Sequence, residues 1–252
     1  MRYKIPMILF ITLSMIFCAS SEKRLAKKRD TDPQYQYNVG LVYLQNGKYD
    51  EAIRYFQKSL SLRTNFDLAL NAMGLAFFMK GEFQQAVTYF EKCLQVNPGF
   101  TEARNYLGSV YQELGMLNNA EQEYRKAIED ETYKSRELPY YNLARLYYAQ
   151  GKDEEALELV EKSIAINNRM IMSLNLRGVI LERLARINEA IASYSVALQI
   201  APDDINLNYN LAVAYFKSDR RAEAKSLFEK ILLQITDTEM KTKVEEYLKL
   251  LK

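Results

Sequence analysis

The chain has 252 residues, with 34 Lys or Arg against 32 Asp or Glu, and it contains no histidine and two cysteines. The absence of histidine excludes the most common general base, the most common metal ligand and the catalytic triads built on imidazole, and two cysteines are too few for a disulfide framework or a thiolate zinc site. The near balance of charge gives no reason to expect nucleic-acid binding, which depends on basic surfaces that neutralise phosphates.

Residues 1–18 have the pattern of an export signal. Arg2 and Lys4 form a short basic head, an apolar run covers 7–17, and small residues follow it. This run is too short to span a bilayer as a helix, which takes about 20 residues. We therefore expect a secretory signal peptide and a mature protein in a bacterial cell envelope, outside the inner membrane.

Cys18 lies where bacterial lipoprotein signals carry the cysteine that is lipidated. Those signals resemble Leu-(Ala/Ser)-(Gly/Ala)-Cys, whereas Phe17 precedes the cysteine here in place of a small residue. We expect a lipid on Cys18, which buries methylene groups worth roughly 0.8 kcal/mol each in a bilayer. Ala19 and Ser20 favour the outer membrane as its address. The alternative is ordinary cleavage after Ser20, which gives a soluble periplasmic protein.

Residues 19–32 are polar and charged, without apolar periodicity. They are predicted to form a flexible tether that extends by at most about 45 Å, at 3.3–3.6 Å per residue. The basic triplet Lys27, Lys28 and Arg29 in this segment indicates a solvated arm. The alternative is contact with an anionic membrane surface.

From residue 33 onward the chain repeats with a period of about 34 residues. Small residues recur at one place in the period, namely Gly40, Gly74, Gly108, Ala144, Gly178 and Ala212. Alanine recurs at a second place, as Ala52, Ala86, Ala120, Ala156, Ala190 and Ala224. A bulky residue follows each of these alanines, as Phe56, Phe90, Tyr124, Val160, Tyr194 and Phe228. This order and period resemble the tetratricopeptide repeat.

The resemblance implies an all-α fold in which six helical hairpins stack into a right-handed superhelix. The repeats are predicted at 33–66, 67–100, 101–136, 137–170, 171–204 and 205–238, each with a helix A of about 13 residues, a turn and a helix B. The turns carry Gly47, Gly81, Gly115 and Gly151, and glycine suits the left-handed conformation that ends many helices. Ala185 and Asp219 occupy the same place in the last two repeats, so these turns should be less comfortable.

Two further features complete the predicted stack. Residues 239–252 should form a capping helix, with Val244, Leu248 and Leu251 on its apolar side. Cys93 lies at a place in helix B where a small residue is usual, which indicates a buried structural thiol without reactivity.

The step between the third and fourth repeats is longer than the others, 36 residues instead of 34. It contains Asp130 and Tyr133, followed nine residues later by Asn142 and Leu143. A tolerated loop insertion would explain the extra length. The exported chain, with six repeats and this junction, also resembles the type IV pilus biogenesis lipoproteins, the pilotins, which carry Asp-x-x-Tyr and then Asn-Leu-Gly. Ala144 replaces that glycine here.

The pilotin resemblance implies a non-catalytic scaffold on the outer membrane, facing the periplasm and held there by the N-terminal lipid. Its partner would be a secretin subunit of the ring through which the pilus passes, and it would help the secretin to localise and assemble. No cofactor, metal or small-molecule substrate is expected, because the chain shows no phosphate-binding loop and no nucleophile–base pair. The alternative is a general envelope adaptor that recruits cell-wall enzymes or outer-membrane assembly factors.

Helix A of each repeat is expected to line the concave face of the superhelix and to bind a segment of the partner. The predicted groove residues are Tyr37, Leu41, Leu44, Asn71, Leu75, Phe78, Asn105, Tyr141, Arg145 and Tyr148. The same face should continue through Gln112, Asn175, Glu182, Tyr209, Val213 and Phe216. The alternative is that the large side chains pack against the neighbouring helix A.

Overall fold

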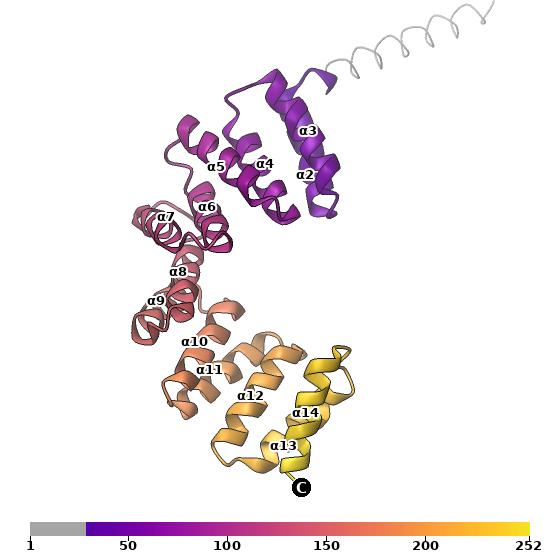
Figure 1. Cartoon of the computed structure of the whole chain (residues 1–252), viewed down its shortest axis with the longest axis vertical. Helices are drawn as coiled ribbons and strands as arrows, with labels where there is room; N and C mark the ends of the chain where they lie inside the picture. The colour runs from indigo at the N-terminus through magenta and orange to yellow at the C-terminus, as the bar shows by residue number, and fades with distance from the viewer. Residues whose placement is uncertain (1–28) are drawn as a thin grey trace, which may run out of the picture. The chain divides into compact units, whose positions relative to one another are not determined.

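The computed structural model describes residues 29–252, and every regular element within this range is an α-helix. The predicted signal peptide, Cys18 and residues 19–28 lie outside the described range. Figure 1 labels the helices α2 to α14 along the chain. The prediction of an all-α fold made of consecutive helical hairpins is confirmed.

Each hairpin consists of a helix A and a helix B of 12–14 residues. The A helices are α2 (Pro33–Gln45), α4 (Asp67–Lys80), α6 (Thr101–Glu113), α8 (Glu137–Ala149), α10 (Ile171–Arg183) and α12 (Ile205–Lys217). The B helices are α3 (Tyr49–Leu62), α5 (Phe83–Val96), α7 (Leu117–Glu129), α9 (Asp153–Ile166), α11 (Ile187–Ile200) and α13 (Arg221–Leu232). A final helix, α14, covers Thr238–Leu250. Every A helix begins at the residue from which the periodicity counts a repeat.

The chain divides into two compact units, one ending at Leu114 and the other beginning at Gly115. In the first unit, each helix from α2 to α6 packs against the next one along the chain. In the second unit, the helices from α7 to α14 do the same. Successive A helices also touch within each unit, α2 with α4 and α4 with α6, then α8 with α10 and α10 with α12. In each unit the A helices therefore lie in a row.

The small residue in helix A is explained by an aromatic ring in helix B. A Cβ atom built on Gly40 would lie 2.5 Å from Phe56, and one on Gly178 would lie 2.3 Å from Tyr194. Gly74 has the same relation to Phe90, at 2.7 Å. These distances are shorter than van der Waals contact allows, so glycine is required wherever the ring takes this position.

The fourth and sixth repeats solve the same packing problem differently. In the fourth, alanine occupies the small position and Val160 replaces the ring, and both side chains are fully buried. In the sixth, Phe228 stacks on Tyr247 of α14, with ring centroids 4.9 Å apart. Each departure from glycine therefore comes with a changed environment on the facing helix or beyond it.

The turns between helix A and helix B require a left-handed backbone. Gly47, Gly81, Gly115 and Gly151 have φ angles between 71° and 81°. Ala185 and Asp219 take φ angles of 59° and 60°, although they carry a Cβ atom. This conformation costs a non-glycine residue about 1–2 kcal/mol. The last two turns therefore place residues with a Cβ atom in the left-handed conformation, as the prediction of less favourable turns requires.

In three hairpins, a side-chain donor late in helix B bonds to a backbone carbonyl at the start of helix A in the same hairpin. Ser59 Oγ donates to the carbonyl of Pro33 at 2.7 Å, and Ser163 Oγ donates to that of Glu137 at 2.9 Å. Cys93 occupies the equivalent place, where its Sγ lies 3.4 Å from the carbonyl oxygen of Asp67. Cys93 is fully buried, as predicted for a structural thiol.

The longer junction before α8 is an ordered turn. The Asp130 carboxylate accepts hydrogen bonds from the backbone N–H of Thr132, at 3.0 Å, and from the Thr132 hydroxyl, at 2.6 Å. The Tyr133 N–H donates to the Asp130 carbonyl at 3.3 Å. Asp130 and Tyr133, two residues of the predicted junction motif, therefore shape the turn itself.

The C-terminal helix α14 closes the second unit. Asp237 caps its start by accepting a hydrogen bond from the Met240 N–H at 2.7 Å. Val244 is fully buried, and Leu248 and Leu251 pack against the apolar cluster of α12 and α13. Within residues 29–252, no helix is both long and apolar enough to cross a bilayer.

Replacing Ala185 with glycine should raise the free energy of unfolding by about 0.5–1 kcal/mol, because relief of the left-handed strain exceeds the entropy cost of glycine. Urea denaturation followed by circular dichroism measures this difference. The matched control is Ala192→Gly, an exposed position inside the neighbouring helix α11, which should lower stability by about 0.5–1 kcal/mol. A loss of stability in Ala185→Gly would contradict the strain.

Burial, aided by the charge of Asp67, raises the pKa of the Cys93 thiol to about 12. In the native protein the Cys93 thiol should therefore resist thiol reagents at pH 8, and it should react fully in denaturant. An unfolded thiol titrates near pH 8.5, so the folded state holds its proton more tightly. The protonated, buried thiol therefore makes its full contribution to the free energy of unfolding below about pH 8.5, and this contribution is lost as the pH rises toward 12. Alkaline unfolding should be less steep in Cys93→Ser, which keeps a hydrogen-bond donor. An equally steep fall in the two proteins would contradict the prediction.

Candidate functional site

The predicted groove residues of α2 are partly used in the protein's own packing. Tyr37, Leu41 and Leu44 are partly buried and pack against an apolar cluster made of Ala52, Ile53, Phe56, Ala72, Met73 and Ala76. The Tyr37 ring lies 6.0 Å from the ring of Phe56 and 5.4 Å from that of Phe66. Burial raises the pKa of the Tyr37 phenol, with smaller effects from the charges of Glu102 and Asp67. These side chains therefore pack against residues of both α3 and α4.

The other predicted residues of the first unit are also half-buried or buried. Asn71 is 7% exposed and Asn105 is 4% exposed. Asn71 Nδ2 donates to Glu102 of α6 at 3.3 Å, which links two neighbouring A helices. Leu75 and Phe78 are half-buried, and the Phe78 ring lies 5.9 Å from that of Phe83. Asn71 and Phe78 therefore take part in contacts within the unit itself.

In the second unit, a pocket of about 370 Å³ opens along the row of A helices. It is lined by Tyr148, Val179, Glu182, Arg183, Tyr194, Tyr209, Asn210, Val213 and Lys217. Tyr148 was predicted as a groove residue, and Glu182, Tyr209 and Val213 were expected on the same face. The structure brings these four together from α8, α10 and α12, three helices that are far apart in sequence.

Glu182 is the centre of the pocket's polar contacts. Its side chain is 12% exposed. The carboxylate accepts a hydrogen bond from the Tyr194 hydroxyl at 2.7 Å and forms an ion pair with Lys217 at 2.7 Å. Burial, and then the hydrogen bond to Glu182, raise the pKa of the Tyr194 phenol. Tyr194 therefore stays neutral and holds the carboxylate in place, while Lys217 of α12 is fixed against α10.

Arg183 makes the equivalent link between α8 and α10. Its guanidinium carbon lies 3.5 Å from the centre of the Tyr148 ring, and Nη2 donates to the Tyr148 carbonyl at 2.5 Å. The same guanidinium forms an ion pair with Asp153 of α9. Asn210 Nδ2 donates to Asn175 Oδ1 at 2.9 Å and joins α12 to α10. Hydrogen bonds, ion pairs and a cation–π contact therefore hold the walls of the pocket together in the absence of a partner.

The chemistry of the pocket suits binding. It offers the aromatic surfaces of Tyr148 and Tyr209, the apolar side chains of Val179 and Val213, and one carboxylate with its cation. Among residues 29–252, no group of three or more His, Cys, Asp or Glu side chains is placed to hold a metal ion. An extended polypeptide segment with apolar or aromatic side chains matches this surface.

Tyr141 and Arg145 share α8 with Tyr148 but do not line the pocket. Phe216 is also outside it, and the centre of its ring lies 5.1 Å from that of Tyr247 of α14. Sequence reasoning missed Val179, Arg183, Asn210 and Lys217 as pocket residues, and it assigned Tyr194 to the core alone. Arg183 and Lys217 are the last residues of α10 and α12. The predicted groove residues lie at the fifth, ninth and twelfth positions of helix A, whereas Asn210 is at the sixth position and Arg183 and Lys217 are at the thirteenth; Val179 is at a ninth position and was overlooked.

Sequence comparison identifies the repeats. Two families described as tetratricopeptide repeat match residues 33–98 and 71–135. A family described as the tetratricopeptide repeat protein 21 C-terminal ARM domain matches residues 128–245. None of the three is an enzyme family. The comparison with curated proteins gave no match.

Two solved structures, PilF and PilW, are similar to this chain over nearly their whole length. PilF of Pseudomonas aeruginosa has a TM-score of 0.77 and 20% identity, covering 86% of this chain and 98% of that one. PilW, a widely conserved type IV pilus biogenesis factor, has a TM-score of 0.77 and 14% identity, covering 84% and 97%. At these identities the likeness shows a common fold.

The same fold occurs in proteins of other kinds. A chain of the APC/C hetero-tetramer Cut9–Hcn1 has a TM-score of 0.76 and 19% identity over 91% of this chain, which spans 44% of that longer chain. In all, 445 chains match, so fold alone does not select a function. The helical hairpins, the small-to-ring contact that repeats in them and the family matches from residue 33 to residue 135 identify this chain as a tetratricopeptide-repeat protein.

Proposed function

We propose that this tetratricopeptide-repeat scaffold binds a segment of another protein in the pocket of its second unit. The observation that carries the proposal is the set of Tyr148, Glu182, Tyr209 and Val213, which three A helices bring to one surface. Aromatic side chains supply much of the binding energy at protein interfaces, and a neighbouring carboxylate and cation can select the register of the bound segment.

The finer proposal is that the partner is a secretin subunit and that the protein acts as a pilotin. Its support is the structural likeness to PilF and PilW over most of this chain and nearly all of theirs. The predicted export signal and the junction motif with Asp130 and Tyr133 point the same way. In this proposal the scaffold holds the secretin while a lipid on Cys18 holds the scaffold at the outer membrane, facing the periplasm.

A general envelope adaptor is the second candidate. The observation that favours it is the similarly high TM-score of the Cut9–Hcn1 chain, which shows that this stack of hairpins serves unrelated assemblies. Such an adaptor would use the same pocket for cell-wall enzymes or outer-membrane assembly factors. The two candidates differ in the identity of the protein that is bound, so capture experiments separate them.

Secretin should be captured by the protein from solubilised cell envelopes, and Tyr148→Ala should weaken this binding by about tenfold or more, as expected for an aromatic hot spot. Titration of purified secretin against each variant measures the change. The matched control is Val196→Ala, an exposed apolar residue on helix B of the neighbouring hairpin, which should bind like the parent protein. Thermal unfolding of the variants shows whether the hairpins remain folded.

Two results would contradict these proposals separately. Capture of cell-wall enzymes without secretin would reject the pilotin role and favour the adaptor. Secretin binding that is unchanged in Tyr148→Ala and Tyr209→Ala would keep the partner but reject the pocket as its site.

A palmitate analogue fed to the producing bacterium should label the wild-type protein and should not label Cys18→Ser. Lipidation also moves the protein into the membrane fraction, because an acylated cysteine buries its chains in the bilayer. Absence of label from the wild-type protein would reject the anchor and favour cleavage after Ser20.

A further inference from the structure

The side of α2 that carries Tyr35 and Val42 differs in exposure from the equivalent side of every later helix A. The third residue of helix A is buried in all five later repeats, as Ala69, Ala103, Pro139, Ser173 and Leu207. The tenth residue is buried as well, as Ala76, Val110, Leu146, Ile180 and Ala214. In the first repeat these positions are Tyr35, which is 39% exposed, and Val42, which is 57% exposed.

The burial in later repeats has a simple cause. Each later helix A packs against helix B of the preceding hairpin, as in α3 with α4, α9 with α10 and α11 with α12. No described hairpin precedes α2, so its apolar side has no equivalent neighbour within residues 29–252. A stack of repeats needs a cover with a polar outer face at each end, and α14 provides it only at the C-terminal end.

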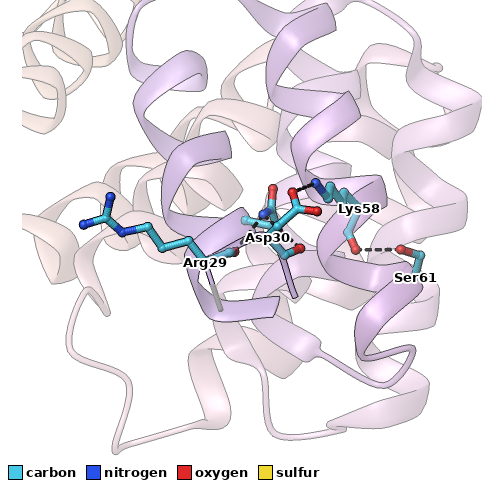
Figure 2. A network of polar contacts seen from close by, with 5 residues as sticks. Arg29, Asp30, Lys58 and Ser61 are labelled. Atoms are coloured by element: carbon cyan, nitrogen blue, oxygen red, sulfur yellow. Dashed lines mark hydrogen bonds and ion pairs between the residues drawn. The ribbon is translucent and has the colours of Figure 1, made fainter. Parts of the chain in front are cut away.

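Figure 2 shows Arg29 and Asp30 where the chain enters the first hairpin, with Asp30 next to Lys58. Gln36, a buried residue of α2, donates from Nε2 to the carbonyl of Arg29 at 3.0 Å and to that of Asp30 at 3.4 Å. Asp30 forms an ion pair with Lys58 of α3, whose own carbonyl accepts a hydrogen bond from Ser61 at 2.7 Å. These contacts fix residues 29 and 30 against the first hairpin.

Arg29 already reaches the exposed side of α2. Its guanidinium carbon lies 5.9 Å from the centre of the Tyr35 ring, a distance that allows a cation–π contact. The backbone at Arg29 and Asp30 is helical. The preceding part of the chain therefore starts next to the first of the two exposed apolar residues.

We propose that residues 19–28 cover the apolar side of α2 and that Leu25 is the residue that anchors them there. Leu25 is the one large apolar side chain in residues 19–32. It precedes Arg29 by four residues, the spacing that keeps two side chains on one side of a helix. Tyr35 and Val39 are also four residues apart. In an antiparallel pair, Arg29 on Tyr35 therefore places Leu25 on Val39, next to Val42.

This segment is the occupant that the geometry favours over a second copy of the chain. It is joined covalently to the surface, so its effective concentration there is high without any association step. A second copy would have to bring Tyr35 and Val42 together with their own equivalents across a two-fold axis. The proposal does not depend on which partner the second unit binds.

The test uses the mature chain from residue 18, with Cys18→Ser and an added Val42→Cys, and measures the rate of maleimide labelling. Cys93 is buried and does not compete. The reference for an uncovered side chain is Leu233→Cys, since Leu233 is 91% exposed. The thiol introduced at position 42 should be labelled at least about tenfold more slowly than the reference, in line with the protection that burial gives a thiol.

Adding Leu25→Asp should bring labelling at position 42 close to the reference rate, because a charge does not stay against an apolar side. The matched control is Lys27→Asp, two residues away and on the opposite side of a helix, which should leave the protection in place. A second measurement does not require a charge to be placed at position 25 or 27. Leu25→Cys combined with Val39→Cys should form a disulfide within one chain on mild oxidation.

Three outcomes would overturn the proposal. Labelling at position 42 could equal the reference in the parent chain, or protection could survive Leu25→Asp. Alternatively, Val42→Cys alone could give disulfide-linked dimers on oxidation, which would assign the apolar side of α2 to a second copy.

Discussion

The contact between a residue without a side chain in helix A and a ring in helix B sets the geometry of these hairpins. Gly178 lies so close to Tyr194, and Gly40 to Phe56, that a single methyl group would not fit between them. Such a contact fixes where two helices cross, because the ring can enter the facing helix only at that one point. Every hairpin that shares it presents the same two sides to its neighbours, which is why identical hairpins can stack.

Stacking then converts a local contact into a binding surface. The A helices lie in a row within each unit, so residues that are three or four positions apart on each helix converge on one face. In the second unit, neighbouring helices on this face are joined by the ion pair of Glu182 with Lys217 and by the cation–π contact of Arg183 with Tyr148. A surface held in this way loses little conformational entropy when a partner binds, and that saving favours affinity.

The sequence predicted the features that each hairpin settles alone. Periodicity located the glycines, the rings and the two left-handed turns without glycine, because each depends on residues within one repeat. Periodicity could not predict which large side chains would remain exposed for a partner to contact. Helical position indicates the side on which Tyr37 or Leu44 lies, but how far each is buried depends on how α3 and α4 pack around it. Pairs such as Asn175 with Asn210 join separate repeats, and the spacing between them is known only once the hairpins are stacked.

The two turns that lack glycine follow directly after the two cations of the pocket. Arg183 ends α10 two residues before Ala185, and Lys217 ends α12 two residues before Asp219. Glycine in these turns would relieve strain, but it would also widen the range of backbone angles available at the end of each helix. A residue with a Cβ atom narrows that range. The last two hairpins therefore accept a cost in folding free energy and obtain a stiffer support for the guanidinium and the ammonium group.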